Sequence, residues 1–181
     1  MNTIAQVKHS HLQLALLSAF ALFAAAAGGN AVAANATATA TTTVVSPIAI
    51  TKAVDLAFGN IFASGTAGTV SVDTDGSRTV SGGVTLGSGS GTAAKFDITG
   101  TGTMTYGITY ASGVTLTGTG APMALTQVSN LSGAAGAGGL VATGTLTAGA
   151  QSLYIGGTLA VGANQTAGSY TANITATVEY N

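Results

Sequence analysis

Apolar and polar residues alternate along much of the chain with the period of two that is typical of half-buried β-strands. Residues 94–99 and 103–110 follow this pattern, and shorter candidate strands lie at 48–50, 54–58, 69–72, 114–117, 123–128, 141–146 and 152–161. The longest case spans residues 169–180, where polar residues separate six apolar ones: Tyr170, Ala172, Ile174, Ala176, Val178 and Tyr180. Helical spacing does not recur, so the pattern predicts an all-β protein.

Residues that favour turns separate the predicted strands. They include Asp75-Gly76, Gly82-Gly83 and Ser112-Gly113, and glycine supplies the positive φ angles that tight hairpins need. Short strands at this spacing predict a single antiparallel sandwich or barrel domain over residues 48–181. The glycine-rich stretch Ser132–Gly139 has no periodicity, and we expect it to form a flexible surface loop.

The first 34 residues have the features of a secretory signal peptide. Lys8 precedes an apolar stretch from Leu12 to Ala27, and small residues at the end of the segment fit cleavage after Ala33 or Ala34. The stretch is short for a membrane-spanning helix, and no later segment is long and apolar enough to be one. Residues 35–47 then form an N-terminal extension, which is either a disordered leader or a tail with strand potential, because Ala and Thr alternate within it.

The composition argues against catalysis, metal binding and nucleic-acid binding. The chain has no cysteine, and both histidines, His9 and His11, lie in the predicted signal, which excludes the usual nucleophile and zinc arrangements. Asp73 and Asp75 are most simply part of a hairpin turn, with a weak Ca²⁺ loop or a catalytic pair as alternatives. Charged residues make up 5% of the chain and form no basic cluster, so we expect no cofactor, no metal, no nucleic-acid partner and no enzymatic activity.

Four strings in order along the chain resemble the DUF4402 family, which is similar to the spore-coat-U-type and other pilins of chaperone–usher systems. The strings are Leu56-Ala57-Phe58-Gly59-Asn60-Ile61, residues 94–100, Ile155-Gly156-Gly157-Thr158-Leu159 and the C-terminal residues 168–181. The resemblance covers residues 47–181. It implies an exported structural subunit of a surface fibre (pilus or fimbria) of a Gram-negative bacterium.

The resemblance also implies how such a subunit assembles. The fold would be an incomplete immunoglobulin-like sandwich, whose groove is filled first by a periplasmic chaperone and then, at an outer-membrane usher, by the extension of the next copy. The C-terminal alternation ends at the last residues of the chain, which agrees with a missing final strand. The acceptor groove would be lined by the six apolar residues of 169–180 named above. Gly168 and Tyr180 occupy the positions that chaperone-bound pilins typically conserve as a glycine and a penultimate tyrosine. The donor residues of the extension would be Ala36, Ala38, Ala40 and Val44, which are smaller than usual donor anchors.

Two other functions fit the same pattern. A secreted or adhesive β-sandwich that does not polymerise would need the same strands. A small outer-membrane β-barrel would also have amphipathic strands, but its two aromatic girdles are hard to build from five tyrosines, five phenylalanines and no tryptophan.

Overall fold

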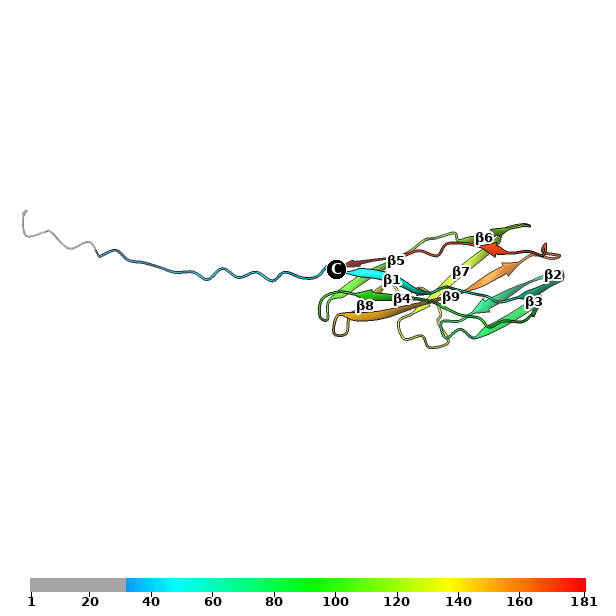
Figure 1. The fold of residues 1–181 in the computed structure, drawn as a ribbon, viewed down its shortest axis with the longest axis horizontal. Coiled ribbons are helices and arrows are strands. Elements are labelled where there is room, and N and C mark those ends of the chain that lie inside the picture. The colour runs from blue at the N-terminus through cyan, green and yellow to red at the C-terminus, as the bar shows by residue number, and fades with distance from the viewer. Residues whose placement is uncertain (1–31) are drawn as a thin grey trace, which may run out of the picture. The chain divides into compact units, whose positions relative to one another are not determined.

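The computed structural model describes residues 32–181, so the predicted signal peptide (1–34) lies almost wholly outside the described residues. Residues 32–48 belong to no helix or strand and are exposed up to Pro47. A compact unit spans Thr43–Asn181, and its strands form an antiparallel sandwich (Figure 1). The predicted all-β fold is confirmed.

Eleven strands make up the described part of the chain. They are β1 (Ala49–Val54), β2 (Ile61–Val72), β3 (Arg78–Leu86), β4 (Ala94–Thr99), β5 (Thr105–Tyr110), β6 (Thr115–Gly118), β7 (Met123–Asn130), β8 (Thr143–Thr145), β9 (Ala150–Val161), β10 (Tyr170–Thr171) and β11 (Ala176–Tyr180). Within these residues no helix is long and apolar enough to cross a membrane.

The long strand β9 organises the larger sheet. Its first half pairs with β4 and its second half with β2 on one side, while β7 pairs along its other side. Strand β1 extends the sheet beyond β4, β3 extends it beyond β2, and β6 and β10 continue it beyond β7. The middle of β9 is Gly156-Gly157, and a Cβ at Gly156 would collide with the Val72 carbonyl of β2. The glycines therefore allow β9 to pair on both sides at this crowded point.

The smaller sheet has the order β11-β5-β8. Two clusters of buried side chains form the core. The first centres on Ile98, Tyr106 and Leu153, and the second on Val70 and Leu159. Leu56 and Ile174 are only partly buried, and each packs against both clusters. These two side chains therefore mark the place where the two parts of the core approach each other.

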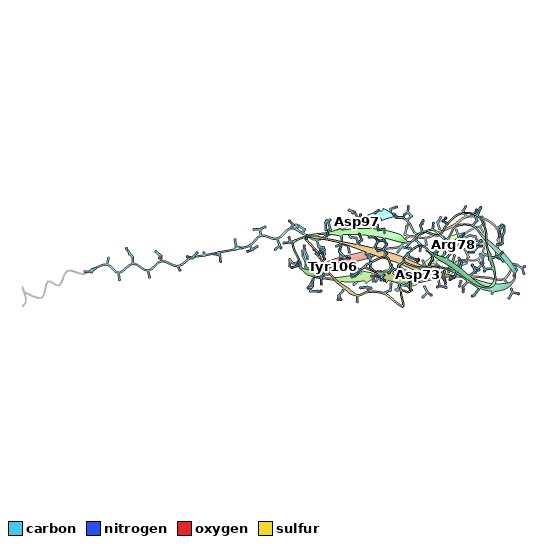
Figure 2. All side chains as sticks on the ribbon, turned by 90° about the horizontal axis from the view of Figure 1, so that it is seen from below. Asp73, Arg78, Asp97 and Tyr106 are labelled. Atoms are coloured by element: carbon cyan, nitrogen blue, oxygen red, sulfur yellow. The ribbon has the colours of Figure 1, made fainter. Side chains whose placement is uncertain are left out.

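Arg78 supports two loops at the end of the β2–β3 hairpin. Its guanidinium donates hydrogen bonds to the carbonyls of Phe58 (2.7 Å) and Gly87 (3.3 Å), and also to those of Asn60 and Gly89. Figure 2 shows Asp73 near the middle of the sandwich, Arg78 further toward one end and Tyr106 toward the other. Because a guanidinium has five N–H donors in one plane, a single side chain holds both loops.

The observed strands differ from the predicted ones chiefly in the C-terminal segment, at residues 54–58 and at β3. The predicted strand 169–180 is divided into β10, which pairs with β6 in the larger sheet, and β11, which pairs with β5 in the smaller one. The division arises because β5 and β6, which residues 111–114 connect, belong to different sheets. The C-terminal segment pairs first with β6 and then with β5, so it passes from the larger sheet to the smaller one. Residues 54–58 do not form the predicted strand, because Val54 ends β1 and Ala57 forms only an isolated bridge with Thr92. Strand β3, whose residues are mostly exposed, was expected only as the segment that follows the Asp75-Gly76 hairpin turn.

Candidate functional site

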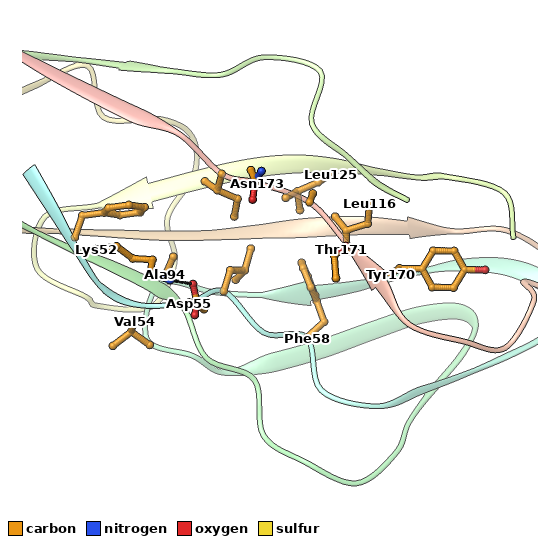
Figure 3. Close-up of a pocket in the computed structure, with 14 residues that line it drawn as sticks. Lys52, Val54, Asp55, Phe58, Ala94, Leu116, Leu125, Tyr170, Thr171 and Asn173 are labelled. Atoms are coloured by element: carbon orange, nitrogen blue, oxygen red, sulfur yellow. Dashed lines mark hydrogen bonds and ion pairs between the residues drawn. The ribbon is translucent and has the colours of Figure 1, made fainter. Parts of the chain in front are cut away.

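An apolar groove opens between two chain segments that are distant in sequence. One wall is formed by residues 52–58, which leave β1, and the other by residues 170–174, which include β10 (Figure 3). Its volume is about 290 Å³. The lining residues are Lys52, Val54, Asp55, Leu56 and Phe58 on the first wall, Tyr170, Thr171, Ala172, Asn173 and Ile174 on the second, and Ala94, Phe96, Leu116 and Leu125 on the floor. The groove is at the lower end of the size range of ligand pockets.

The floor of the groove is continuous with the core. Ala94 and Leu125 are buried members of the first and second cluster respectively. Leu56 and Ile174, from opposite walls, contact both clusters and remain half-buried. An apolar side chain placed between them would therefore extend the core across the groove and remove more apolar surface from water.

Part of each wall has backbone that no described strand pairs. Among the residues the structure describes, β1 on the first wall pairs only with β4, whereas on the second wall Tyr170 and Thr171 pair with β6. Residues 172–175 lie between β10 and β11 and belong to no strand. Free backbone donors and acceptors beside an apolar surface are the arrangement to which an added strand binds.

One ion pair lies at the rim of this groove, whose lining also includes the polar side chains of Thr171 and Asn173. The Lys52 Nζ atom is 2.6 Å from Asp55 Oδ1, and the two side chains are 57% and 78% exposed. In the β1–β4 register Lys52 is opposite Phe96, which also lines the groove. The lysine thus lies on the core-facing side of an edge strand, although its charge is still in contact with water.

A small hydrogen-bond network holds the start of the sandwich beside its C-terminal strand. The Tyr180 hydroxyl donates to the Ser46 carbonyl (3.1 Å) and accepts from the Thr101 amide (2.7 Å). The Ser46 amide in turn donates to Thr101 Oγ1 (2.7 Å). The chain is therefore fixed at Ser46, directly before Pro47, and residues further toward the N-terminus are outside this network.

The structure divides the predicted acceptor residues into two groups. Tyr170, Ala172 and Ile174 line the groove. Ala176, Val178 and Tyr180 pack against the first core cluster from β11 and do not line it. The predicted alternation is visible in the exposure except at Ala172, which is exposed. The other five apolar residues are partly or fully buried, and the polar ones between them are all exposed: 169, 171, 173, 175, 177 and 179.

The other predicted residues lie outside the groove. The donor candidates Ala36, Ala38, Ala40 and Val44 are exposed, Val44 by 91%, and belong to no strand. Gly168, with φ 152°, precedes β10 and has the Thr119 side chain where a Cβ would lie. Because Tyr180 ends β11, these two residues stand at opposite ends of the C-terminal segment, and their suggested role with a chaperone stays a prediction.

The first wall and the floor were not predicted as parts of a site. Leu56 and Phe58 appeared in a candidate strand and in a string that resembles the family, and Leu116 and Leu125 only within candidate strands. Lys52 and Asp55 gave no signal, because a lysine and an aspartate three residues apart are common on solvated surfaces. Only the tertiary fold brings these residues opposite 170–174.

The Asp73–Gly76 segment forms the predicted turn. The Gly76 amide donates to the Asp73 carbonyl (2.9 Å), and β2 and β3 pair on either side. The Asp73 carboxylate accepts hydrogen bonds from the amides of Gly136 (2.7 Å) and Thr74 (2.7 Å), and the bond from Gly136 contributes most to lowering its pKa. This aspartate thus holds the 132–139 loop, and the described residues contain no group of three or more His, Cys, Asp or Glu side chains that could hold a metal.

Comparison with known families gives one match, and it covers the whole sandwich. The matching family is described as a domain of unknown function, DUF4402, and its model aligns with residues 48–180. Comparisons with curated proteins and with solved structures returned no match. The matched range includes both walls and the floor of the groove and excludes the extension. The chain therefore belongs to the DUF4402 family.

Proposed function

We propose that this chain is a structural subunit of an extracellular fibre, in which the groove of one copy receives the N-terminal extension of the next. The observation that carries the proposal is the groove itself, with its apolar floor and, on each wall, a stretch of backbone that no described strand pairs. A second chain in extended conformation would satisfy the backbone groups and cover Leu56 and Ile174 together.

The extension has the matching properties. Residues 35–47 contain no charged residue, and Val44 is a large apolar side chain with 91% of its surface exposed. Eleven extended residues, from 35 to 45, reach about 36 Å at about 3.3 Å per residue, which is ample for a wall of five to seven residues. The alanines and Val44 would face the groove together with Thr42, which has the same spacing, while Thr37, Thr39, Thr41 and Thr43 would face water.

The energetics favour backbone pairing over anchor burial. Three alanine methyls and one valine side chain contribute about 5 kcal/mol when buried, at about 0.8 kcal/mol per carbon. Ordering nine residues costs more than this, at about 1–2 kcal/mol each. The donated strand must therefore gain a large share of its stability from hydrogen bonds to both walls. A periplasmic chaperone and an outer-membrane usher would protect the groove until assembly.

The test is deletion of residues 35–45 from the full-length gene, expressed in the bacterium that carries the secretion partners. We expect the truncated subunit to fold and reach the periplasm but to form no fibres in negatively stained electron micrographs. Replacing the same eleven residues with a glycine–serine sequence of equal length should also abolish fibres, because it keeps the reach but removes the methyl groups. Fibres of normal length that contain the truncated subunit would refute assembly through the extension. Absence of fibres from the unchanged strain would favour a secreted module that does not polymerise.

A further inference from the structure

The groove is not uniformly apolar, and its two charged side chains lie together on one wall. Lys52 and Asp55 form their ion pair on the first wall, next to the floor residue Phe96. A charged side chain on the core-facing side of an edge strand is a feature by which proteins resist indiscriminate strand pairing. In the free subunit the pair costs little, because water still reaches both side chains.

The free-energy cost of covering this ion pair depends on which side chain covers it. A bulky apolar side chain would remove water from two charges and return no hydrogen bond, which is unfavourable. An alanine methyl leaves room for water at the rim, and a threonine hydroxyl both donates and accepts hydrogen bonds. From Asn35 to Thr43 the extension contains only Asn, Ala and Thr, so its composition suits the rim.

The extension of a second copy is the occupant that the geometry favours. Ser46 precedes proline, which restricts it to extended conformations, and Thr101 and Tyr180 hold it in place. A reversal of the chain at this point, which the subunit's own extension would need to enter its own groove, is therefore disfavoured.

We propose that the Lys52–Asp55 ion pair determines which donor strand the groove accepts: it admits the small and hydroxyl side chains of a second copy's extension and rejects bulky apolar ones. This inference rests on the proposed function, because it concerns the specificity of the same groove. The ion pair of the receiving subunit would then explain why the donor residues of the extension are unusually small.

The experiment combines changes in the donor and in the groove of the full-length chain. Ala36, Ala38 and Ala40 are each replaced by leucine, alone and together with the double substitution Lys52→Met and Asp55→Asn. The oligomeric fraction of secreted protein is measured by size-exclusion chromatography. At one or more of the three positions we expect leucine to reduce oligomers about tenfold and the double substitution to restore them. The position that is rescued identifies the tail residue that lies over the ion pair.

The matched control is Lys95→Met with Asp97→Asn. This pair is separated by 3.0 Å, lies on the neighbouring strand β4 and does not line the groove, so its removal should rescue no leucine variant. Circular dichroism checks that every variant is folded. Lys52→Met alone provides the same test if the double variant is not secreted, since Asp55 stays largely solvated.

The outcomes separate the two proposals. Three results would overturn the selective role of the ion pair and leave fibre assembly intact, provided that the wild-type chain forms oligomers. Leucine substitution could cause no loss of oligomers, the groove variants could fail to rescue that loss, or the Lys95 control could rescue it equally. If the wild-type chain forms no oligomers with its secretion partners present, the proposed function fails, and the selectivity fails with it.

Discussion

Two tyrosines on strand β5 should respond to loss of the hydroxyl group in opposite directions. Tyr106 is fully buried, and its hydroxyl has no hydrogen-bond partner among the described residues. The ring packs closely on the backbone of β8, where a Cβ at Gly144 would collide with it. Burial raises the pKa of Tyr106, so the hydroxyl stays neutral over the ordinary pH range. The Tyr110 hydroxyl, in contrast, donates to the Val141 carbonyl (2.8 Å) and lies 2.9 Å from Ser129 Oγ.

The magnitudes follow from this difference. An unpaired buried hydroxyl costs about 1–3 kcal/mol, so Tyr106→Phe should raise the free energy of unfolding by about 1–2 kcal/mol without leaving a cavity. Tyr110→Phe leaves the Val141 carbonyl without this bond and removes a partner of the buried Ser129. We expect it to lower the free energy of unfolding by about 1–3 kcal/mol.

The assay is urea unfolding of the two variants and the unchanged protein at pH 7, followed by far-ultraviolet circular dichroism. The slope of the transition should be the same in all three, which would show that the compactness of the native and denatured states is unchanged. A loss of 1 kcal/mol or more in Tyr106→Phe would refute the reasoning, because it would mean that the hydroxyl makes a favourable hydrogen bond in the native state.

Two further predictions concern the groove wall and the Asp73 loop. Ile174→Asp should abolish fibres, because it places a carboxylate between the two core clusters. Thr175→Asp, at an exposed neighbour, should change stability by less than about 1 kcal/mol. Equal effects of the two substitutions, measured by electron microscopy and urea unfolding, would contradict the assignment of this wall. The lowered pKa of Asp73 means that its contribution to stability is complete above about pH 4 and is lost as the pH falls through its folded-state pKa. Asp73→Asn should lower the free energy of unfolding at pH 7 by about 1 kcal/mol and flatten its dependence on pH below 4, and an unchanged acid profile would argue against the role of this carboxylate.

The strands that alternate strictly were predictable because a period of two places one face of each strand in the core. This holds for β4, for β9 and for the burial of Val178 in β11. Strand β3 and the first part of β2 were not predictable in this way, since Phe62 is 64% exposed and most of their residues face water. Pairing across the Asp73–Gly76 turn, rather than burial of one face, makes these residues strands.

The sequence located one wall of the groove and missed the other. Ile174 belongs to a long alternating segment, so its apolar face could be predicted without the fold. Leu56 faces it only because β1 and the C-terminal segment meet at the side of the sandwich, and a contact between residues so far apart leaves no local pattern. The division of the predicted 169–180 strand also depends on tertiary pairing, because it follows the separation of β5 from β6.

The loops held by Arg78 should exchange their amide protons as one unit. The Gly87 amide donates to the Asn60 carbonyl (2.8 Å) and the Asn60 amide to the Ser88 carbonyl (3.1 Å), while the guanidinium donates to the same Asn60 carbonyl and to the Gly87 carbonyl. Neither amide can reach solvent unless the two loops separate, and separation breaks the arginine contacts at the same time. Hydrogen exchange at Asn60 and Gly87 should therefore proceed at similar rates, and both rates should rise together when Arg78 is replaced by lysine, whose single ammonium group cannot span both loops.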